Sequence, residues 1–293
     1  MAETLIGTHN AAVARRLWVD GITQAHDIVV VMDKIVNVRK KKFLFAQIES
    51  FPILPTNTAN DVGSGGTISP TADTVTDRQI TVNVEKEASI DIRKSAVDLS
   101  MPETSRAYQA NLGHRIAKSK DLEMLSNDAS WTASSPGLGS AASPVAFTEG
   151  AVRLAVEAIE AANTPRINRY GVIHSKNWTE LVDSDRVGNA AALGATLANN
   201  PIVRGVRPDG RTGLFLSGVE IVVSNNVPLS GTTSRRCQVF HGPDMALAMN
   251  NEITFEKTSQ TAAKLVMWLF LSTALWGDGV IQTGAGVVVY STP

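Results

Sequence analysis

One stretch constrains the fold of this 293-residue chain more than any other, a long alternation of apolar and polar residues. Its apolar members stand at even positions, interrupted only by Lys86: Ile80, Val82, Val84, Ala88, Ile90 and Ile92. Successive side chains of a β-strand point to opposite faces, so the alternation predicts a strand with one buried face. Thirteen such positions span about 40 Å, whereas an ordinary strand has five or six residues. The pattern therefore predicts a strand that protrudes from a compact fold.

A polar, turn-rich segment precedes this strand. Residues 51–77 contain three prolines and the run Gly63-Ser64-Gly65-Gly66, among many Thr, Asn and Asp residues. Such a composition buries little apolar area and predicts a long exposed loop. We interpret the region as a protruding hairpin whose other leg is formed by residues 42–53. Because an isolated hairpin is only marginally stable in water, we expect it to lie on another surface.

Two helices are predicted beside the hairpin. Apolar residues within 22–38 recur at spacings of three and four, which favours an amphipathic helix, although the β-branched residues leave a strand as the alternative. Residues 101–125 predict a long helix that begins with the capping-box sequence Ser100-Met101-Pro102-Glu103.

The remaining sequence mixes helices and strands. Thr148 and Ser175 are predicted to cap two helices. Strands are predicted at 170–174, 219–223, 238–240, 253–256, 264–275 and 286–290. Trp268 belongs to a stretch in which both alternating sets are apolar, which predicts burial on both faces. The fold class is therefore α+β.

Composition argues against several functional classes. The chain has 27 basic and 28 acidic residues, whereas a free nucleic-acid-binding protein carries a basic excess. A single cysteine, Cys237, excludes an intramolecular disulfide and a cysteine-rich zinc site. The most apolar run, 265–271, is too short for a bilayer, which takes about 20 residues, so no membrane contact is predicted.

Motifs for catalysis are also missing from the sequence. The five histidines stand at no helical metal-binding spacing, and neither a nucleophile elbow nor a phosphate-binding loop occurs. His174 and Cys237 are interpreted as packing or strand-end residues. We therefore predict no enzyme, no cofactor and no metal.

The order of the elements resembles that of the major capsid proteins of tailed bacteriophages, which have the Hong Kong 97-type fold. The resemblance covers most of the chain and depends on element order, because its motifs are degenerate. The passages that carry it are the strand 78–93 running into the helix at Met101, Tyr170-Gly171-Val172-Ile173-His174-Ser175-Lys176-Asn177-Trp178, the passage 218–228 that ends in Val227-Pro228, and Gly242-Pro243-Asp244-Met245-Ala246-Leu247-Ala248.

This resemblance implies a division of the chain and a function. The division is an N-terminal arm and helix (1–40), an extended hairpin loop (41–93), a peripheral domain with the spine helix (94–144 and 236–293) and an axial domain (145–235). The function would be self-assembly, as hexamers and pentamers, into the icosahedral shell of a virion. That shell would assemble in the host cytoplasm and enclose double-stranded DNA without sequence specificity. Portal, scaffolding and decoration proteins would be further partners.

Two alternatives stay open. The first is an encapsulin-like nanocompartment shell, which shares the fold but encloses protein cargo. The second is a soluble α/β enzyme without a recognisable motif.

The basic run Arg39-Lys40-Lys41-Lys42 can be solvated, or can contact DNA or acidic residues of a neighbouring subunit. We favour the lateral contact, with Glu85 and Glu87 as partners. The full set of candidate intersubunit residues is Arg15, Arg16, Arg39, Lys40, Lys41, Lys42, Gly63, Gly65, Gly66, Glu85, Glu87 and Trp268.

Overall fold

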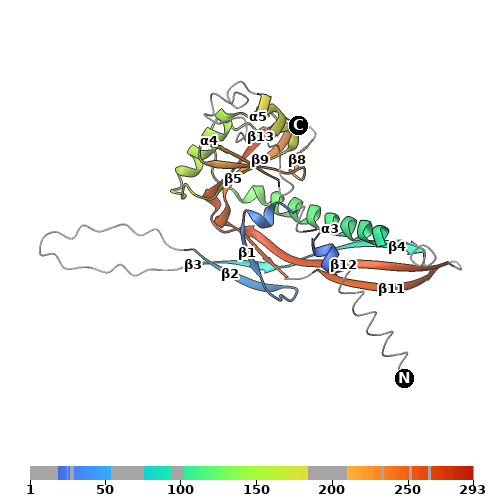
Figure 1. The fold of residues 1–293 in the computed structure, drawn as a ribbon. Coiled ribbons are helices and arrows are strands. Elements are labelled where there is room, and N and C mark those ends of the chain that lie inside the picture. Colours follow the sequence, from blue (N-terminus) through green and yellow to red (C-terminus); the bar gives the residue numbers. More distant parts are fainter. Residues whose placement is uncertain are drawn as a thin grey trace, which may run out of the picture.

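The computed structural model describes residues 19–24, 26, 30–53, 76–93, 102–183, 210–231, 234–250, 253–262 and 265–292. Within these residues the chain forms a five-stranded sheet, a six-stranded sheet and a two-stranded hairpin. A long helix lies along the first sheet, and the second sheet sits with two shorter helices beyond one end of that helix (Figure 1).

One strand organises the first sheet, which we call the long sheet. Strand β12 (Leu265–Val280) is 16 residues long and pairs antiparallel with three other strands. A fourth strand, β1, extends the sheet by pairing in parallel with β10. The partners of β12 and the added strand are β4 (Val84–Arg93), β10 (Met245–Met249), β11 (Thr254–Ala262) and β1 (Asn37–Lys40).

The predicted hairpin is present. Strands β2 (Gln47–Ile53) and β3 (Thr76–Val82) pair antiparallel, with Ile53 opposite Thr76. On the inner face of the hairpin, Phe51 and Ile80 pack with Ala246 of β10. This end of the hairpin therefore lies on the long sheet of its own chain, which stabilises it.

The prediction of one continuous strand through residue 92 is wrong. Asn83 separates β3 from β4, and β4 pairs with β12 instead of with the other leg of the hairpin. Both strands bury their even-numbered residues, Val82 against Phe43 and Ala88 against the long helix. The same alternation of apolar and polar residues therefore continues through two strands that have different partners. This is why the sequence pattern predicts a single strand.

Strand β3 passes very close to β12 at Gly277. A Cβ atom on Gly277 would overlap the carbonyl oxygen of Thr81, so only glycine permits this crossing. At Gly279 an added Cβ would lie 3.6 Å from Cδ1 of Ile80, which is an ordinary contact.

The predicted helix over 22–38 is also wrong. Residues 19–24 are helical, but the chain then forms the short 3₁₀-helix η1 (Met32–Lys34) and continues into β1. Ile22, Met32 and Ile35 are all buried, so the apolar spacing reflects burial of several short elements. Pairing of β1 with β10, which is distant in sequence, overrides the local preference for a helix.

The long helix α3 (Pro102–Leu125) is confirmed. Leu112 and Ile116 pack against Ala88 of β4, which fixes the helix on one face of the long sheet. The predicted capping residue Ser100 lies outside the described residues.

The second sheet, which we call the compact sheet, has the strand order β13-β9-β5-β7-β6, with β8 paired to β9. It contains strands from both sides of residue 235, so β9 and β13 pair within the same sheet as β5 and β7. Its strands are β5 (Arg169–Ile173), β6 (Arg211–Leu216), β7 (Val219–Val223), β8 (Leu229–Ser230), β9 (Ser234–His241) and β13 (Gly286–Ser291), and its helices are α4 (Glu149–Glu160) and α5 (Ser175–Asp183). The short 3₁₀-helices η2 (Ser126–Ser130), η4 (Gly242–Asp244) and η5 (Thr283–Ala285) complete the described elements.

The caps of the two helices differ from each other. Thr148 caps α4 as predicted, its hydroxyl accepting from the N–H of Ala151. Ser175 does not cap α5 but is its first residue. The ring Nδ1 of His174 accepts from the N–H of Lys176 at 3.1 Å instead, because this ring nitrogen can replace a hydroxyl oxygen as the acceptor.

Polar bonds join the end of α3 to the compact sheet. Arg236 of β9 donates to both carboxylate oxygens of Asp128 in η2, at 2.7 and 2.9 Å. Gln238 of β9 donates to the carbonyl oxygen of Leu125 and accepts from the indole N–H of Trp131. The last turn of the helix is therefore bonded to a central strand of the sheet.

Candidate subunit interface

The turn that leads into the hairpin is held firmly. Phe43 is buried, and its N–H donates to Oδ1 of Asn250 at 2.7 Å. Leu44 and Gln47 close the turn with two hydrogen bonds, one from each N–H. Ala46 has a φ of 63° and donates its N–H to the carbonyl oxygen of Val82. These bonds fix the backbone between β1 and β2 in one conformation.

This fixed turn presents large apolar side chains to solvent. Leu44 is 71% exposed, Phe45 61% and Ile48 53%. We call these three residues the hairpin-root patch. Clustered exposed apolar side chains are typical of surfaces that bind another molecule.

The basic run beside the patch divides into two pairs. Arg39 donates to Glu49 at 2.8 Å and stacks on the ring of Phe51, and Lys41 binds the second carboxylate oxygen of Glu49. Hydrogen bonds from Lys41 and then from Arg39 lower the pKa of Glu49. Lys40 and Lys42 are exposed and form no ion pair with any residue that the structure describes.

The acidic candidates lie on β4. Glu85 and Glu87 are exposed, and so is Asp91, which lies four residues after Glu87 on the same strand. Their positions alternate with residues that face α3, so the three carboxylates share the sheet face opposite the helix.

The centre of this sheet face is apolar. Leu269 of β12 stands opposite Asp91 in the strand register, and Leu271 stands two residues along, opposite Ser89. Both leucines are only partly buried. On the far side of β12, exposed Glu256 of β11 pairs with Leu271. We call Glu85, Glu87, Asp91, Glu256, Leu269 and Leu271 the acidic sheet face.

Several predicted contact residues cannot be placed. Arg15, Arg16, Gly63, Gly65 and Gly66 lie outside the described residues. The backbone of Trp268 pairs with Ile92, but its side chain lies outside the description as well.

Sequence reasoning missed the hairpin-root patch. The available signal is the run of three large apolar residues from Phe43 to Phe45, since a turn can bury only part of such a run. Only Phe43 turns inward, and its two successors remain in solvent.

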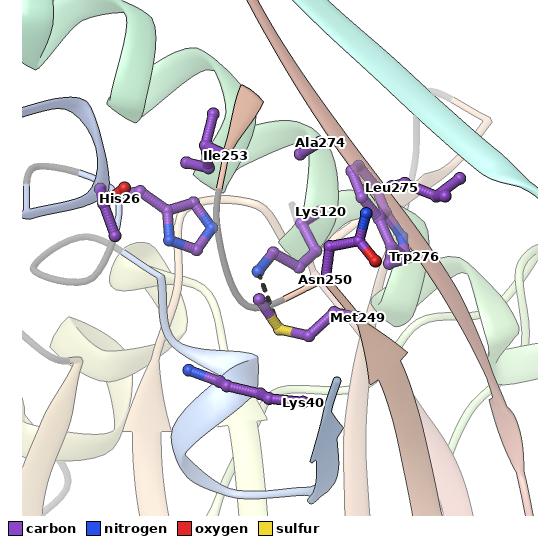
Figure 2. Close-up of a pocket in the computed structure, with 10 residues that line it drawn as sticks. His26, Lys40, Lys120, Met249, Asn250, Ile253, Ala274, Leu275 and Trp276 are labelled. Carbon is purple, nitrogen blue, oxygen red and sulfur yellow. Dashed lines mark hydrogen bonds between the residues drawn. The ribbon is translucent and has the colours of Figure 1, made fainter. Parts of the chain in front are cut away.

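A small internal cavity lies close to several ionisable groups. Its volume is about 40 Å³, and His26, Lys40, Lys120, Met249 and Trp276 are among its lining residues (Figure 2). Substrate pockets usually measure several hundred Å³, so this cavity has room for water but not for an organic substrate. It is therefore a packing feature where the N-terminal segment, α3, β10 and β12 meet.

Two neighbouring residues of α3 hold the N-terminal segment at this junction. Lys120 is buried and donates to Asp33 at 2.7 Å; burial lowers its pKa, which Asp33 opposes. Asp121 is buried too and accepts from the N–H groups of Val31 and Met32 and from the amide of Asn226. Burial raises the pKa of Asp121 to about 6.

The other reactive groups are structural. Burial raises the pKa of the Cys237 thiol to about 11, so the thiol stays protonated at neutral pH. Among the described residues, no group of three or more His, Cys, Asp and Glu side chains is arranged to hold a metal ion. No helix in the described ranges has the length and hydrophobicity needed to cross a membrane.

The fold is that of phage capsid subunits. A chain of Mycobacterium phage Che8 matches with a TM-score of 0.61 and 19% identity, over 88% of this chain and 90% of that chain. A chain from the capsid of cyanophage P-SCSP1u matches with a TM-score of 0.58 and 16% identity, over 90% of this chain and 88% of that chain. A chain of the virus-like particle from Pyrococcus furiosus matches with a TM-score of 0.58 and 11% identity, over 94% of this chain and 99% of that chain.

In sequence, no protein-family model and no curated protein matches the chain. The fold implied by the resemblance is nevertheless confirmed as a mixed helix and strand capsid fold, while its finer division into subdomains stays a prediction.

Proposed function

We propose that this chain is the major capsid protein of a tailed bacteriophage, a structural protein and not an enzyme. The observation that carries the proposal is the structural match to phage capsid subunits. The match covers almost the whole of this chain and almost the whole of each matched chain. A match of this extent leaves little of either chain for an additional catalytic domain.

The parts of the chain are assigned to roles in this proposal. The long sheet with α3 corresponds to the peripheral domain with its spine helix. The compact sheet with α4 and α5 corresponds to the axial domain, now including β9 and β13. The hairpin of β2 and β3 corresponds to the base of the extended loop, and the segment before β1 to the N-terminal arm.

The partners follow from the same proposal. Copies of the chain assemble as hexamers and pentamers into a closed shell in the host cytoplasm, and the finished virion encloses double-stranded DNA. Portal, scaffolding and decoration proteins are further partners. The net charge of −1 supports non-specific enclosure, because a strongly basic inner wall would hold the packed DNA in place.

A nanocompartment shell is the second candidate. The match to the virus-like particle from Pyrococcus furiosus, which covers 99% of that chain, supports a closed particle of either kind. The two candidates share the subunit fold and differ in what the shell contains.

Electron microscopy of the purified chain, followed by analysis of native particles, tests the proposal. We expect closed particles from the chain alone, and nuclease-resistant double-stranded DNA in particles isolated from the natural host. Closed particles that hold a defined protein cargo and no nucleic acid would establish the nanocompartment. A small oligomer that never closes into particles would overturn both candidates.

A further inference from the structure

The small cavity in Figure 2 is lined by positively charged and hydrogen-bonding side chains. Lys40, Lys120 and His26 line it, together with Thr23 and Asn250. None of its lining residues in the described part of the chain is acidic. We propose that this cavity binds a monatomic anion, which is chloride in ordinary buffers, between the amines of Lys40 and Lys120. Such a structural ion is independent of the proposed function.

The fold brings the two lysines together from different elements. Lys40 of β1 stands opposite Met249 of β10 in the strand register. The amine of Lys120 in α3 lies 3.6 Å from Sδ of the same Met249. Burial lowers the pKa of Lys120, and the nearby charge of Lys40 lowers it further, whereas Asp33 raises it. Two like charges held close together repel each other, and an anion between them offsets the repulsion.

The carboxylates near this junction leave positive charge for the cavity. The ammonium group of Lys120 has three N–H donors, and two of them have acceptors, Oδ2 of Asp33 at 2.7 Å and Sδ of Met249. Asp121 accepts from backbone N–H groups and does not line the cavity. Lys40 forms no ion pair with any residue in the described ranges. One donor of Lys120 and the charge of Lys40 therefore remain for an anion.

The neutral groups of the lining also suit an anion. Oγ1 of Thr23 is buried and has no hydrogen-bond partner among the described residues. Oδ1 of Asn250 accepts from the N–H of Phe43, so the NH₂ group is the donor that this amide offers. A buried water molecule takes two to four polar partners and both donates and accepts, whereas an anion takes donors and positive charge alone. The lining therefore favours an anion over water.

Size and access restrict which anion fits. A volume of about 40 Å³ holds roughly three waters at about 10–15 Å³ each, so chloride fits with little space to spare. Sulfate and phosphate, with their tetrahedral oxygens, are too large. Lys40 is exposed although it lines the cavity, so an ion reaches the site from solvent beside this side chain. A bound ion joins the N-terminal segment, β1 and α3.

Thermal melting of the full chain in different sodium salts tests the site. At matched ionic strength, chloride and bromide should raise the melting temperature by about 2–5 °C relative to glutamate, and the rise should saturate, because only the folded chain binds the ion. Lys40→Met should fold, since Lys40 is exposed, but lose this difference. Lys42→Met is the matched control, because Lys42 is also exposed but does not line the cavity. It should keep the wild-type difference.

A second pair of variants tests the hydroxyl of Thr23. Thr23→Val removes the donor, and hydrogen bonds to charged groups are among the stronger ones in proteins. We expect the chloride concentration at half-maximal effect to rise by at least about tenfold. Thr23→Ser keeps the hydroxyl and should remain close to the wild type.

Crystals of the chain grown in sodium bromide locate the ion by its anomalous scattering. A bromide peak between Lys40 and Lys120, together with the halide-specific melting shift, supports the site. Water alone in the cavity, or equal salt effects in the wild type and Lys40→Met, would overturn it. A bromide peak without the melting shift would mean an adventitious ion only and would overturn it as well. None of these measurements involves particles, so the proposed capsid function stands or fails separately.

Discussion

At the scale of single residues, α3 shows that the polarity of a side chain is a poor predictor of its burial. Lys120 is 1% exposed and Asp121 0%, whereas the adjacent Leu122 is 44% exposed. Helical periodicity assigns charged residues to the solvent-exposed face of a helix, so it could not identify Lys120 and Asp121 as buried. Their burial depends on the segment around Val31 and Met32, which supplies N–H donors to Asp121.

Asp121 should make stability depend on pH. Its pKa rises from 3.8 to about 6 on folding, so the folded chain binds the proton more tightly. The resulting contribution is greatest below pH 3.8, falls as the pH rises, and is lost above about pH 6. At about 1.36 kcal/mol per pKa unit, the decline amounts to about 3 kcal/mol. Denaturant unfolding of the subunit between pH 4 and pH 7 measures it.

The control for this prediction is Asp121→Asn, which keeps an acceptor oxygen but cannot titrate. Burial also raises the pKa of Asp128, and burial and Glu123 raise the pKa of Asp278 to about 6, so the wild type alone would combine several groups. The difference between wild type and Asp121→Asn isolates Asp121. Equal pH dependence in the two proteins would show that Asp121 does not titrate in this range.

At the scale of elements, sequence predicted what short-range patterns determine. Helix α3 and strand β7 were found at nearly the observed bounds, and α4 was found with its observed cap, because helical periodicity, a β-branched run and the Thr148 cap are local signals. Strands β1, β6 and β10 were not predicted. The β1 strand is stabilised by parallel pairing of Asn37 with Ala246, and no local pattern encodes a partner so distant in the sequence.

The candidate interface was predicted only in part. Exposed Glu85 and Glu87 agree with the alternation from which they were chosen. The sequence could not show which members of the basic run form ion pairs within the chain. Arg39 and Lys41 bind Glu49, whereas Lys40 and Lys42 do not. That contact depends on how β1 and β2 come together in three dimensions.

The crossing of β3 over β12 gives a prediction with its own control. Gly277→Ala should lower the free energy of unfolding by about 1–3 kcal/mol, because the added Cβ must push the backbone at Thr81 away. Gly279→Ala, two residues along the same strand, meets only an ordinary contact and should change stability by less than about 0.5 kcal/mol. Denaturant unfolding of both variants provides the comparison. Equal effects would contradict the close crossing.

At the scale of the whole molecule, the hairpin is built so that its two legs can be joined directly. Ile53 and Thr76 stand opposite each other at the ends of β2 and β3. Replacing residues 54–75 with the two-residue turn Asn-Gly should therefore leave a folded subunit. We expect that subunit to lose closed particles, because the sequence predicts that the deleted loop reaches a neighbour.

Thermal melting and electron microscopy decide this prediction together. A melting temperature close to that of the wild type, with no closed particles, supports the role of the loop between subunits. Closed particles of normal size and stability would show that the loop has no such role. The replacement leaves β2, β3 and the hairpin-root patch in place, so the result reports on the deleted loop alone.

The bonds that join the end of α3 to β9 have a mechanical consequence. Arg236 with Asp128, and Gln238 with Leu125, act as a cross-brace between the helix and the compact sheet. Identical copies on a closed surface meet their neighbours at more than one angle, so each copy must yield somewhere. While these hydrogen bonds are intact, we expect α3 and the compact sheet to move together as one rigid body. We therefore expect curvature to be accommodated along the far half of β12, where β4 and β11 can twist without breaking the brace.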